Sequence, residues 1–223
     1  MDRKYVVLGL TLYVAMISIG ISLKYTELWS LNMDLTTLIV NHTNESTTRL
    51  LASVFSLTAS VFAVWVALLL IITYVYVRGG NIDLKAMVTL SLLTLILTEL
   101  VVMLSKYHFS ILRPGVNITV SYVGSEVLKL YAYPSGHSAR STVMAYWLPY
   151  IVMSIIRDRI IRKRKRLYRL ISFALWLWVA VVSLCRVITQ EHYVLDVIGG
   201  VLTGLGSVFL MKPLLPLIKE RIS

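Results

Sequence analysis

The feature that most constrains this chain is a series of apolar runs, each long enough to cross a lipid bilayer. The runs cover residues 5–23, 51–77, 86–104, 137–156, 167–184 and 193–211. A helix crosses the hydrocarbon core with roughly 20 apolar residues, so six spans are expected. Lipid cannot hydrogen-bond an exposed backbone, and the alternating pattern of a membrane barrel is absent, so the spans should be helices. The sequence therefore predicts an all-α fold, a bundle of six transmembrane helices.

Composition places the chain among integral membrane proteins. Apolar residues make up 57% and charged residues 15%, against about 25% charged residues in soluble domains. The one cysteine, Cys185, excludes an intramolecular disulfide. No repeat and no Gly- or Pro-rich linker divides the sequence, so residues 1–223 are expected to form a single domain. The first apolar run lacks an A-x-A cleavage site, and we expect it to remain as a span rather than to be removed as a signal peptide.

The distribution of lysine and arginine predicts the orientation. With the N-terminus inside, fifteen of them lie on the cytoplasmic side and seven on the outer side. The positive-inside rule therefore favours both termini in the cytoplasm. Eight of the fifteen lie in 157–169, "RDRIIRKRKRLYR", which we interpret as a topology determinant and a contact for anionic lipid. The net charge of +11 thus does not indicate a nucleic-acid partner, and nothing in the sequence indicates an obligate protein partner.

Two outer connections, 24–50 and 105–133, carry most of the polar sequence. They contain three glycosylation sequons, at Asn41, Asn44 and Asn117, whose use depends on the host cell. The stretch "SYVGSEVLKLY", 121–131, has the spacing of a short interfacial helix, which could cover a site as a lid or serve only as a connector.

Ionisable residues gather at the outer ends of the predicted spans. Charges at membrane depth are costly and usually mark functional sites. His192 and Asp196 are four residues apart, so on a helix they share one face. The carboxylate can then accept the Nδ1 proton and leave Nε2 as an oriented nucleophile, although an isolated pair of this kind could also be a simple polar contact. Nearby ionisable residues favour a site; they are Lys106, Arg113, His137 and Arg186.

These residues fall into three motifs in order along the chain. "KYHFSILRP" (106–114) matches K-x6-R-P, "PSGH" (134–137) is the second motif, and "CRVITQEHYVLD" (185–196) matches S-R-x5-H-x3-D except that Cys185 stands where serine is usual. Together they resemble the signature of the type 2 phosphatidic acid phosphatase superfamily. Its members include lipid phosphate phosphatases, polyprenyl diphosphate phosphatases, glucose-6-phosphatase and vanadium haloperoxidases. The resemblance implies a membrane-embedded phosphatase that needs no metal and no other cofactor.

The resemblance also implies a role for each matched residue. His192 would attack phosphorus and become a phosphohistidine, with its tautomer held by Asp196, while His137 would protonate the leaving oxygen and then activate water. Three cations and the turn before span four would bind the phosphate oxygens; these groups are Lys106, Arg113, Arg186, Ser135 and the Gly136 amide. The turn lies at a helix N-terminus, where the helix dipole favours an anion.

The predicted substrate is a lipid phosphate in the outer leaflet of the plasma membrane. We favour a polyprenyl diphosphate of the undecaprenyl or dolichyl kind, with phosphatidate or phosphatidylglycerophosphate as the alternative. A protein that only binds or transports a lipid phosphate is the alternative from another class.

Several conspicuous residues are interpreted as structural. Gly199, Gly200 and Gly204 have the spacing of helix packing, and Glu99 is expected to make an internal polar contact. His42 and His108 should lie at the surface. Cys185 is expected to weaken phosphate binding modestly if the usual serine hydroxyl touches the phosphate, because a thiol is a weaker donor.

Overall fold

The computed structural model describes residues 2–43, 46–114, 130–156 and 161–222. Within these ranges the fold is all-α, as predicted, and the only β-structure is a single bridge between Leu112 and Tyr131. The α-helices are α1 (Arg3–Tyr25), α2 (Leu28–His42), α3 (Ser46–Ser56), α4 (Val61–Val77), α5 (Ile82–Phe109), α7 (Gly136–Ile155), α8 (Ile161–Ile188), α9 (Val194–Met211) and α10 (Leu215–Ile222). Two short 3-10 helices, Leu57–Ala59 and Lys212–Leu214, join α3 to α4 and α9 to α10.

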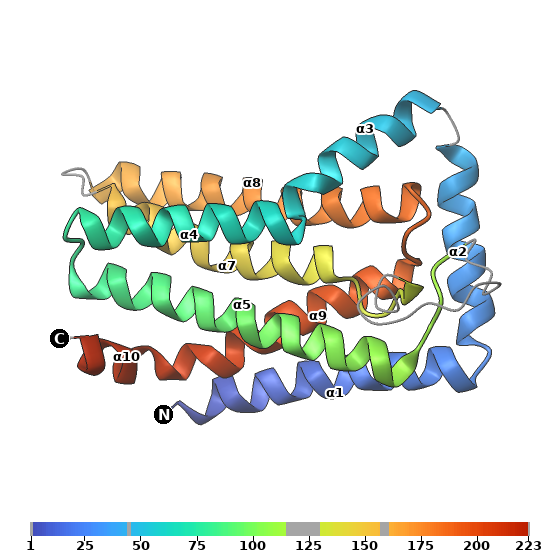
Figure 1. The fold of residues 1–223 in the computed structure, drawn as a ribbon, viewed down its shortest axis with the longest axis horizontal. Helices are drawn as coiled ribbons and strands as arrows, with labels where there is room; N and C mark the ends of the chain where they lie inside the picture. Colours follow the sequence, from blue (N-terminus) through green and yellow to red (C-terminus); the bar gives the residue numbers. More distant parts are fainter. Residues whose placement is uncertain (1, 44–45, 115–129, 157–160, 223) are drawn as a thin grey trace.

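Six long helices, α1, α4, α5, α7, α8 and α9, run along the long axis of a bundle (Figure 1). Helix α7 lies at the centre and packs against α4, α5, α8 and α9. Thirteen of its twenty residues are buried. The end of the bundle formed by the start of α7, the end of α5 and the start of α9 is the end that carries the three sequence motifs.

Five segments of the described chain are long and apolar enough to cross a membrane: Arg3–Tyr25, Ser46–Val77, Ile82–Phe109, Lys165–Ile188 and Val194–Ile222. They account for five of the six predicted spans. The sixth, 137–156, corresponds to α7, which is not in this set because its first turns are polar. A helix surrounded by other helices need not be apolar on every face, since its polar side chains find partners within the protein.

Close contact between α7 and α9 depends on two glycines one turn apart. A Cβ placed on Gly200 would lie 2.3 Å from the Ser135 carbonyl oxygen, and one on Gly204 would lie 2.6 Å from the Ala139 carbonyl oxygen. No side chain fits in either gap. The prediction that these glycines serve helix packing is therefore confirmed, and the packing fixes the start of α9 beside the start of α7.

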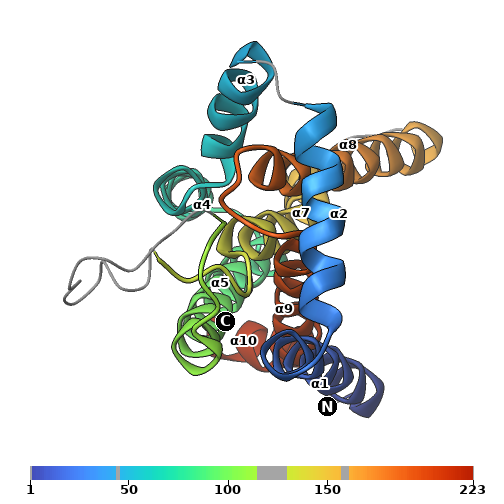
Figure 2. The same ribbon diagram turned by 90° about the vertical axis from the view of Figure 1, so that its right-hand side faces the viewer.

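The predicted outer connection 24–50 is more ordered than its polar sequence suggested. It contains α2, which crosses the end of the bundle over α8 and α9 (Figure 2), and the beginning of α3. The predicted span 51–77 is broken at Ser60, which caps α4 by accepting a hydrogen bond from the Ala63 amide. Most of the predicted interfacial helix 121–131 lies outside the described residues, as do Asn44 and Asn117.

Both chain ends lie at the end of the bundle away from the motifs (Figure 1). Lys219 of α10 pairs there with Asp83 at the start of α5, at 2.7 Å, and the Lys212 ammonium lies 4.3 Å from the centre of the Tyr5 ring of α1. The basic residues near both termini are thus on one side of the molecule and the motifs on the other.

Candidate active site

Two backbone hydrogen bonds bring the first two motifs together. Helix α5 ends at Ser110, which adopts a left-handed conformation with φ of 53°. The chain beyond it then pairs with the segment that precedes the PSGH turn, because the Arg113 amide donates to the Leu130 carbonyl at 3.0 Å and the Ala132 amide donates to the Ile111 carbonyl at 2.7 Å. The Lys106 ammonium donates to the Tyr131 carbonyl. Lys106 and Arg113 are therefore held beside the turn.

Buried Tyr133, which directly precedes the PSGH turn, fixes the turn against α1 and α9. Its hydroxyl donates to the Met16 carbonyl of α1, and its ring lies where a Cβ on Gly199 would be, at 2.5 Å. The Ser135 amide donates to the Asp196 carbonyl at 2.9 Å, which joins the turn to the first turn of α9. That amide is consequently not a donor for phosphate, and the backbone donors left at this end are those of the first residues of α7.

The third motif is folded into a tight turn between α8 and α9. Gln190 is left-handed, with φ of 56°, and this reversal lets the amides of Glu191 and His192 both donate to the Arg186 carbonyl at 3.1 Å. Helix α8 therefore ends at Ile188, and the chain turns back on itself before α9 begins. As a result, Arg186 and His192 are adjacent in space.

Asp196 lies close to His192, as predicted, although His192 lies in the turn before α9 and does not share a helix with Asp196. Its Oδ2 accepts a hydrogen bond from the Tyr193 amide at 2.7 Å and lies 3.6 Å from Nδ1 of His192. Both side chains are buried, and within the described residues neither His192 Nδ1 nor Asp196 Oδ1 has a hydrogen-bond partner. A separation of 3.6 Å is too long for a hydrogen bond, but such contacts in empty sites often shorten when the substrate binds.

His192 is suited to act as a nucleophile because it is neutral. Burial, and then the charges of Lys106 and Arg186, lower the pKa of His192 well below its usual value. A proton on the ring would be unfavourable in this environment, so one ring nitrogen keeps a free lone pair at neutral pH.

A cavity of about 370 Å³ lies at the meeting point of the motifs. Its lining includes five of the predicted site residues: Lys106, Arg113, Gly136, His137 and His192. The other three predicted residues are buried and are not part of this lining: Asp196, Arg186 and Ser135. Val61, Val102 and Met103 complete one apolar side, and Val61 and Met103 are exposed on the outer face of the bundle.

Sequence profiles of known families give a match that covers more than half of the chain. The profile of the PAP2 superfamily matches residues 87–218, which include all three motifs. The chain belongs to the PAP2 superfamily. No curated protein sequence matches it.

Two solved structures resemble this PAP2 chain in fold. One is the "first transmembrane PAP2 type phosphatidylglycerolphosphate phosphatase from Bacillus subtilis", with a TM-score of 0.72, 17% identity and coverage of 96% of this chain and 97% of the other. The second is LpxE of Aquifex aeolicus, with a TM-score of 0.55, 19% identity and coverage of 82% and 95%. The chain thus shares its overall fold with both of these structures.

Glu191 is a residue of this PAP2 site that the sequence analysis missed. Its Oε2 accepts a hydrogen bond from Nη1 of Arg113 at 2.7 Å and another from Nη2 of Arg186. The carboxylate thus bridges two arginines that are both expected to bind phosphate. The signal was present in the sequence, as an acidic residue directly before His192, but it lies at a variable position of the motif.

Glu191 should compete with phosphate for these two arginines. We expect Glu191→Gln to strengthen inhibition by vanadate, a mimic of the pentacoordinate phosphorus, by about two- to fivefold, since a half-exposed ion pair contributes up to about 1 kcal/mol. Inhibition constants from phosphate-release assays give the comparison. Glu27→Gln, which removes an exposed carboxylate on the loop between α1 and α2, serves as the control. Weaker vanadate inhibition in Glu191→Gln would instead mean that the carboxylate positions the arginines.

Two residues of α2 that the sequence analysis also missed cap the start of α9. Asn32 Oδ1 accepts a hydrogen bond from the Leu195 amide at 2.9 Å, and Thr36 Oγ1 accepts one from the Val194 amide at 3.2 Å. Both side chains are buried. They accept hydrogen bonds from amides that a helix start otherwise leaves unpaired. These bonds fix the first turn of α9, which contains Asp196 and follows His192 in the chain.

Cys185 lies away from the cavity. Its side chain is buried against Ala52 of α3 and Ile188, with Ile39 of α2 nearby. In this structure the thiol therefore fills a packing position between α8, α2 and α3. This position does not support a direct contact between residue 185 and the phosphate. Having cysteine instead of the usual serine should therefore not remove a hydrogen bond to the phosphate.

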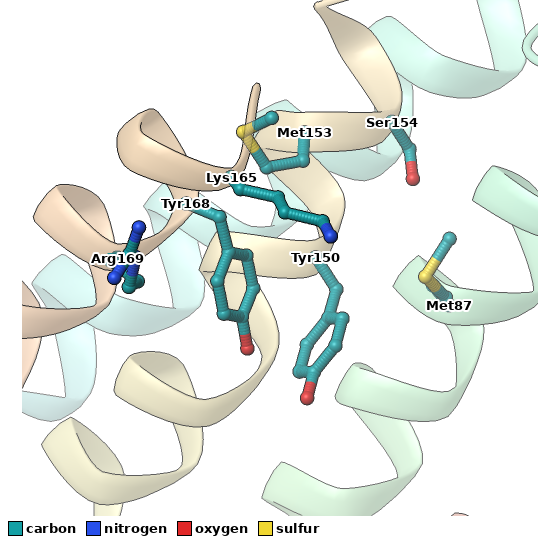
Figure 3. Close-up of a pocket in the computed structure, with 7 residues that line it drawn as sticks. All are labelled: Met87, Tyr150, Met153, Ser154, Lys165, Tyr168 and Arg169. Carbon is teal, nitrogen blue, oxygen red and sulfur yellow. The ribbon is translucent and has the colours of Figure 1, made fainter. Parts of the chain in front are cut away.

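A second, larger cavity of about 760 Å³ lies at the other end of α7 (Figure 3). It is lined by Met87, Tyr150, Met153, Ser154, Lys165, Tyr168 and Arg169. Tyr150 is thirteen residues after His137, which corresponds to about 20 Å along a helix. Among the described residues, the lining has cations and aromatic rings but no histidine and no carboxylate, which are the groups expected for phosphoryl transfer.

Proposed function

We propose that this chain hydrolyses a lipid-linked phosphate or diphosphate through a phosphohistidine intermediate. The observation that carries the proposal is one cavity lined by a neutral buried histidine, a second histidine and two cations, namely His192, His137, Lys106 and Arg113. A nucleophile, a proton donor and charged oxygen ligands are the set that phosphoryl transfer without a metal requires. Membership of the PAP2 superfamily supports the same reaction.

In the first step, Nε2 of His192 attacks phosphorus. The nitrogen–phosphorus bond forms as the bond from phosphorus to the leaving oxygen breaks, and that oxygen keeps the electron pair. His137, which opens α7 and lines the cavity, donates a proton to the leaving oxygen. Lys106 and Arg113 bind the non-bridging oxygens, and Asp196 stabilises the charge that develops on the imidazole.

In the second step, water replaces the lipid group. His137, now deprotonated, takes a proton from water as the water oxygen attacks phosphorus. The nitrogen–phosphorus bond breaks, its electron pair returns to Nε2 of His192, and inorganic phosphate leaves. The arginine pair Arg113 and Arg186 is bridged again by Glu191 once the phosphate has gone.

The substrate class follows from the apolar side of the cavity. Val61 and Met103 are exposed on the bundle surface, which supports an exit for a lipid tail from the cavity between α4 and α5. We favour a polyprenyl diphosphate, and phosphatidate or phosphatidylglycerophosphate is the alternative. The name of the Bacillus subtilis structure favours the alternative, but at 17% identity it speaks for the fold alone.

We further propose that α7 completes a set of six spans and that the site faces the outside of the plasma membrane. Fifteen of the 22 lysines and arginines then lie on the cytoplasmic side. In a Cys185→Ser background, a cysteine at Lys165 should react with an impermeant thiol reagent only after the cells are opened, and a cysteine at His42 should react without opening. The reverse pattern would place the site in the cytoplasm.

Phosphate release by the purified protein tests the proposed function. In detergent with a metal chelator, the protein should release inorganic phosphate from a panel of farnesyl diphosphate, phosphatidate and phosphatidylglycerophosphate, with the highest kcat/KM for the diphosphate. Binding without release from every substrate in the panel would favour the alternative of a non-catalytic lipid-phosphate carrier. A preference for either glycerolipid would replace the polyprenyl assignment.

A further inference from the structure

The cavity that holds the catalytic histidines also holds an ion pair that the reaction described above does not use. Nη1 of Arg140 donates to both carboxylate oxygens of Glu99, at 3.1 and 3.2 Å, and Nε of Arg140 donates to the Ala59 carbonyl at 3.1 Å. The Arg140 side chain is 6% exposed and the Glu99 side chain is 27% exposed. Both residues line the cavity with His137 and His192.

The guanidinium group lies beside the turn that is expected to bind phosphate. A Cβ placed on Gly136 would be 3.0 Å from Nη1 and 3.5 Å from Nη2 of Arg140. Arg140 follows His137 by three residues, so the two side chains leave α7 on the same face. Within the described residues, no hydrogen bond is made by Nη2. Arg140 therefore has a free pair of hydrogens close to the proton donor of the first step.

The pair lies on the membrane side of the reacting groups. Glu99 precedes Lys106 by seven residues on α5, which places it about 10 Å closer to the bilayer centre along the helix. A lipid with its terminal phosphate at His192 and its tail toward the bilayer must pass this pair. The atoms that meet Arg140 are thus those on the lipid side of the scissile bond.

We propose that Arg140 binds the lipid-side phosphate of a diphosphate substrate, and that Glu99 holds the guanidinium in place. The proposal rests on the proposed phosphatase function and deepens it, because it makes Arg140 a residue that selects diphosphates over monophosphates. Arginine suits this role because its planar fork can bond one partner with one edge and a phosphate with another. A charged pair at this depth is costly to bury, which favours a functional role over simple helix packing.

The chemistry of the leaving group gives the selection a physical basis. When a diphosphate is cleaved, the leaving group is a lipid monophosphate that takes the electron pair of the broken bond and gains negative charge at its phosphate. A fixed guanidinium next to that phosphate stabilises the developing charge. When a monoester is cleaved, the leaving group is an alkoxide that must take a proton from His137. Arg140 should thus matter most for diphosphates and His137 most for monoesters.

The test compares two substrates that differ by one phosphate, farnesyl diphosphate and farnesyl phosphate. Arg140→Gln is expected to lower kcat/KM for the diphosphate at least about tenfold more than for the monophosphate, as the loss of one transition-state donor typically does. Arg140→Lys keeps the charge but loses the fork and should give a smaller selective loss. Arg78→Gln, at the opposite end of α4, is the control and should leave the ratio of the two kcat/KM values unchanged.

Glu99→Gln distinguishes a binding role from a structural one. The side-chain oxygen of a glutamine can still accept a hydrogen bond from Nη1 of Arg140 and hold the guanidinium, while the carboxylate beside an arriving phosphate is lost, so this variant should keep or raise the diphosphate rate. Equal losses on both substrates in Arg140→Gln, Arg140→Lys and Glu99→Gln, with a matching fall in melting temperature, would mean that the pair only joins α5 to α7. Should Arg140→Gln fail to fold, Arg140→Lys and Glu99→Gln still decide between these outcomes.

A binding measurement separates failure of the subsite from failure of the proposed function. The wild-type protein should bind the non-hydrolysable farnesyl methylenediphosphonate more tightly than farnesyl phosphonate, and Arg140→Gln should abolish that difference. If the wild-type protein shows the binding difference but hydrolyses neither farnesyl substrate, the subsite stands and the phosphatase proposal falls. If it hydrolyses both substrates while Arg140→Gln leaves the binding difference intact, the subsite proposal is overturned alone.

Discussion

Replacing His192 with alanine should reduce phosphate release to the level of a blank, a loss of about 10⁴-fold or more, because the variant has no nucleophile to accept the phosphoryl group. The comparison is kcat on the preferred lipid phosphate for purified wild-type and variant proteins. His192 is buried at the cavity and bonded through its backbone to Arg186, so the melting temperature should be measured alongside. Appreciable turnover by His192→Ala would refute the phosphohistidine mechanism.

Asp196→Asn should leave a small residual rate, about 10²- to 10⁴-fold below that of the wild type, because the amide keeps the shape of the side chain but not its charge. The Asp196 carboxylate lies 3.6 Å from Nδ1 of His192 and accepts a bond from the Tyr193 amide. An asparagine carries no charge that could stabilise the imidazole of His192. Its side-chain oxygen can still accept the hydrogen bond from the Tyr193 amide. His108→Ala, a histidine substitution on α5 outside the cavity lining, is the matched control and should keep full activity.

The helices and the positions of the site residues were largely predictable from the sequence. The predicted span 137–156 corresponds to α7 at Gly136–Ile155, and 193–211 corresponds to α9 at Val194–Met211. The length of an apolar run is set by the bilayer, so it can be read without any tertiary contact. His192 and Asp196 are only four residues apart, so their proximity is also local, although His192 lies in the turn before α9 and not on the helix that carries Asp196.

Contacts between distant parts of the chain were not predictable in the same way. The Glu99–Arg140 pair joins residues 41 apart, and the bond from Leu195 to Asn32 joins residues 163 apart. Each is decided by how helices pack, which a one-dimensional pattern does not encode. Glu191 was missed for another reason: its partners Arg113 and Arg186 were both assigned to phosphate, and only the folded turn reveals that a carboxylate of the chain reaches them.

The sequence analysis described the connection 24–50 only as polar and did not predict which of its side chains are buried. In the structure, Asn32 and Thr36 face inward and cap α9. A polar side chain in an otherwise apolar helix can be buried when it satisfies the backbone of a neighbouring helix. The i, i+4 spacing of these two residues in "LNMDLTT" is consistent with that role, but the sequence does not identify the helix end that they cap.

Replacing Gly200, at the contact between α7 and α9, should reduce both the stability and the activity of the protein. A Cβ on Gly200 would lie 2.3 Å from the Ser135 carbonyl oxygen and 2.9 Å from Cβ of Ser138. The obstruction is backbone, which cannot rotate away, so Gly200→Ala must move α9 relative to the PSGH turn. We expect the free energy of unfolding to fall by about 1–3 kcal/mol, and the melting temperature to fall by about 2–4 °C per kcal/mol for a chain of this size.

Activity should fall further than stability in Gly200→Ala, by about 10²-fold in kcat, because a displacement near 1 Å is enough to misalign a nucleophile with its substrate. Gly206→Ala on the same helix is the matched control. A Cβ there would lie 3.2 Å from ring carbons of Tyr13 and 3.3 Å from the Gly9 carbonyl oxygen, a much looser fit than at Gly200, so the loss should be smaller in both assays. Equal behaviour of the two variants would mean that α9 tolerates displacement, and the hydrogen bond from the Ser135 amide to the Asp196 carbonyl would then not be what aligns His192 with the turn.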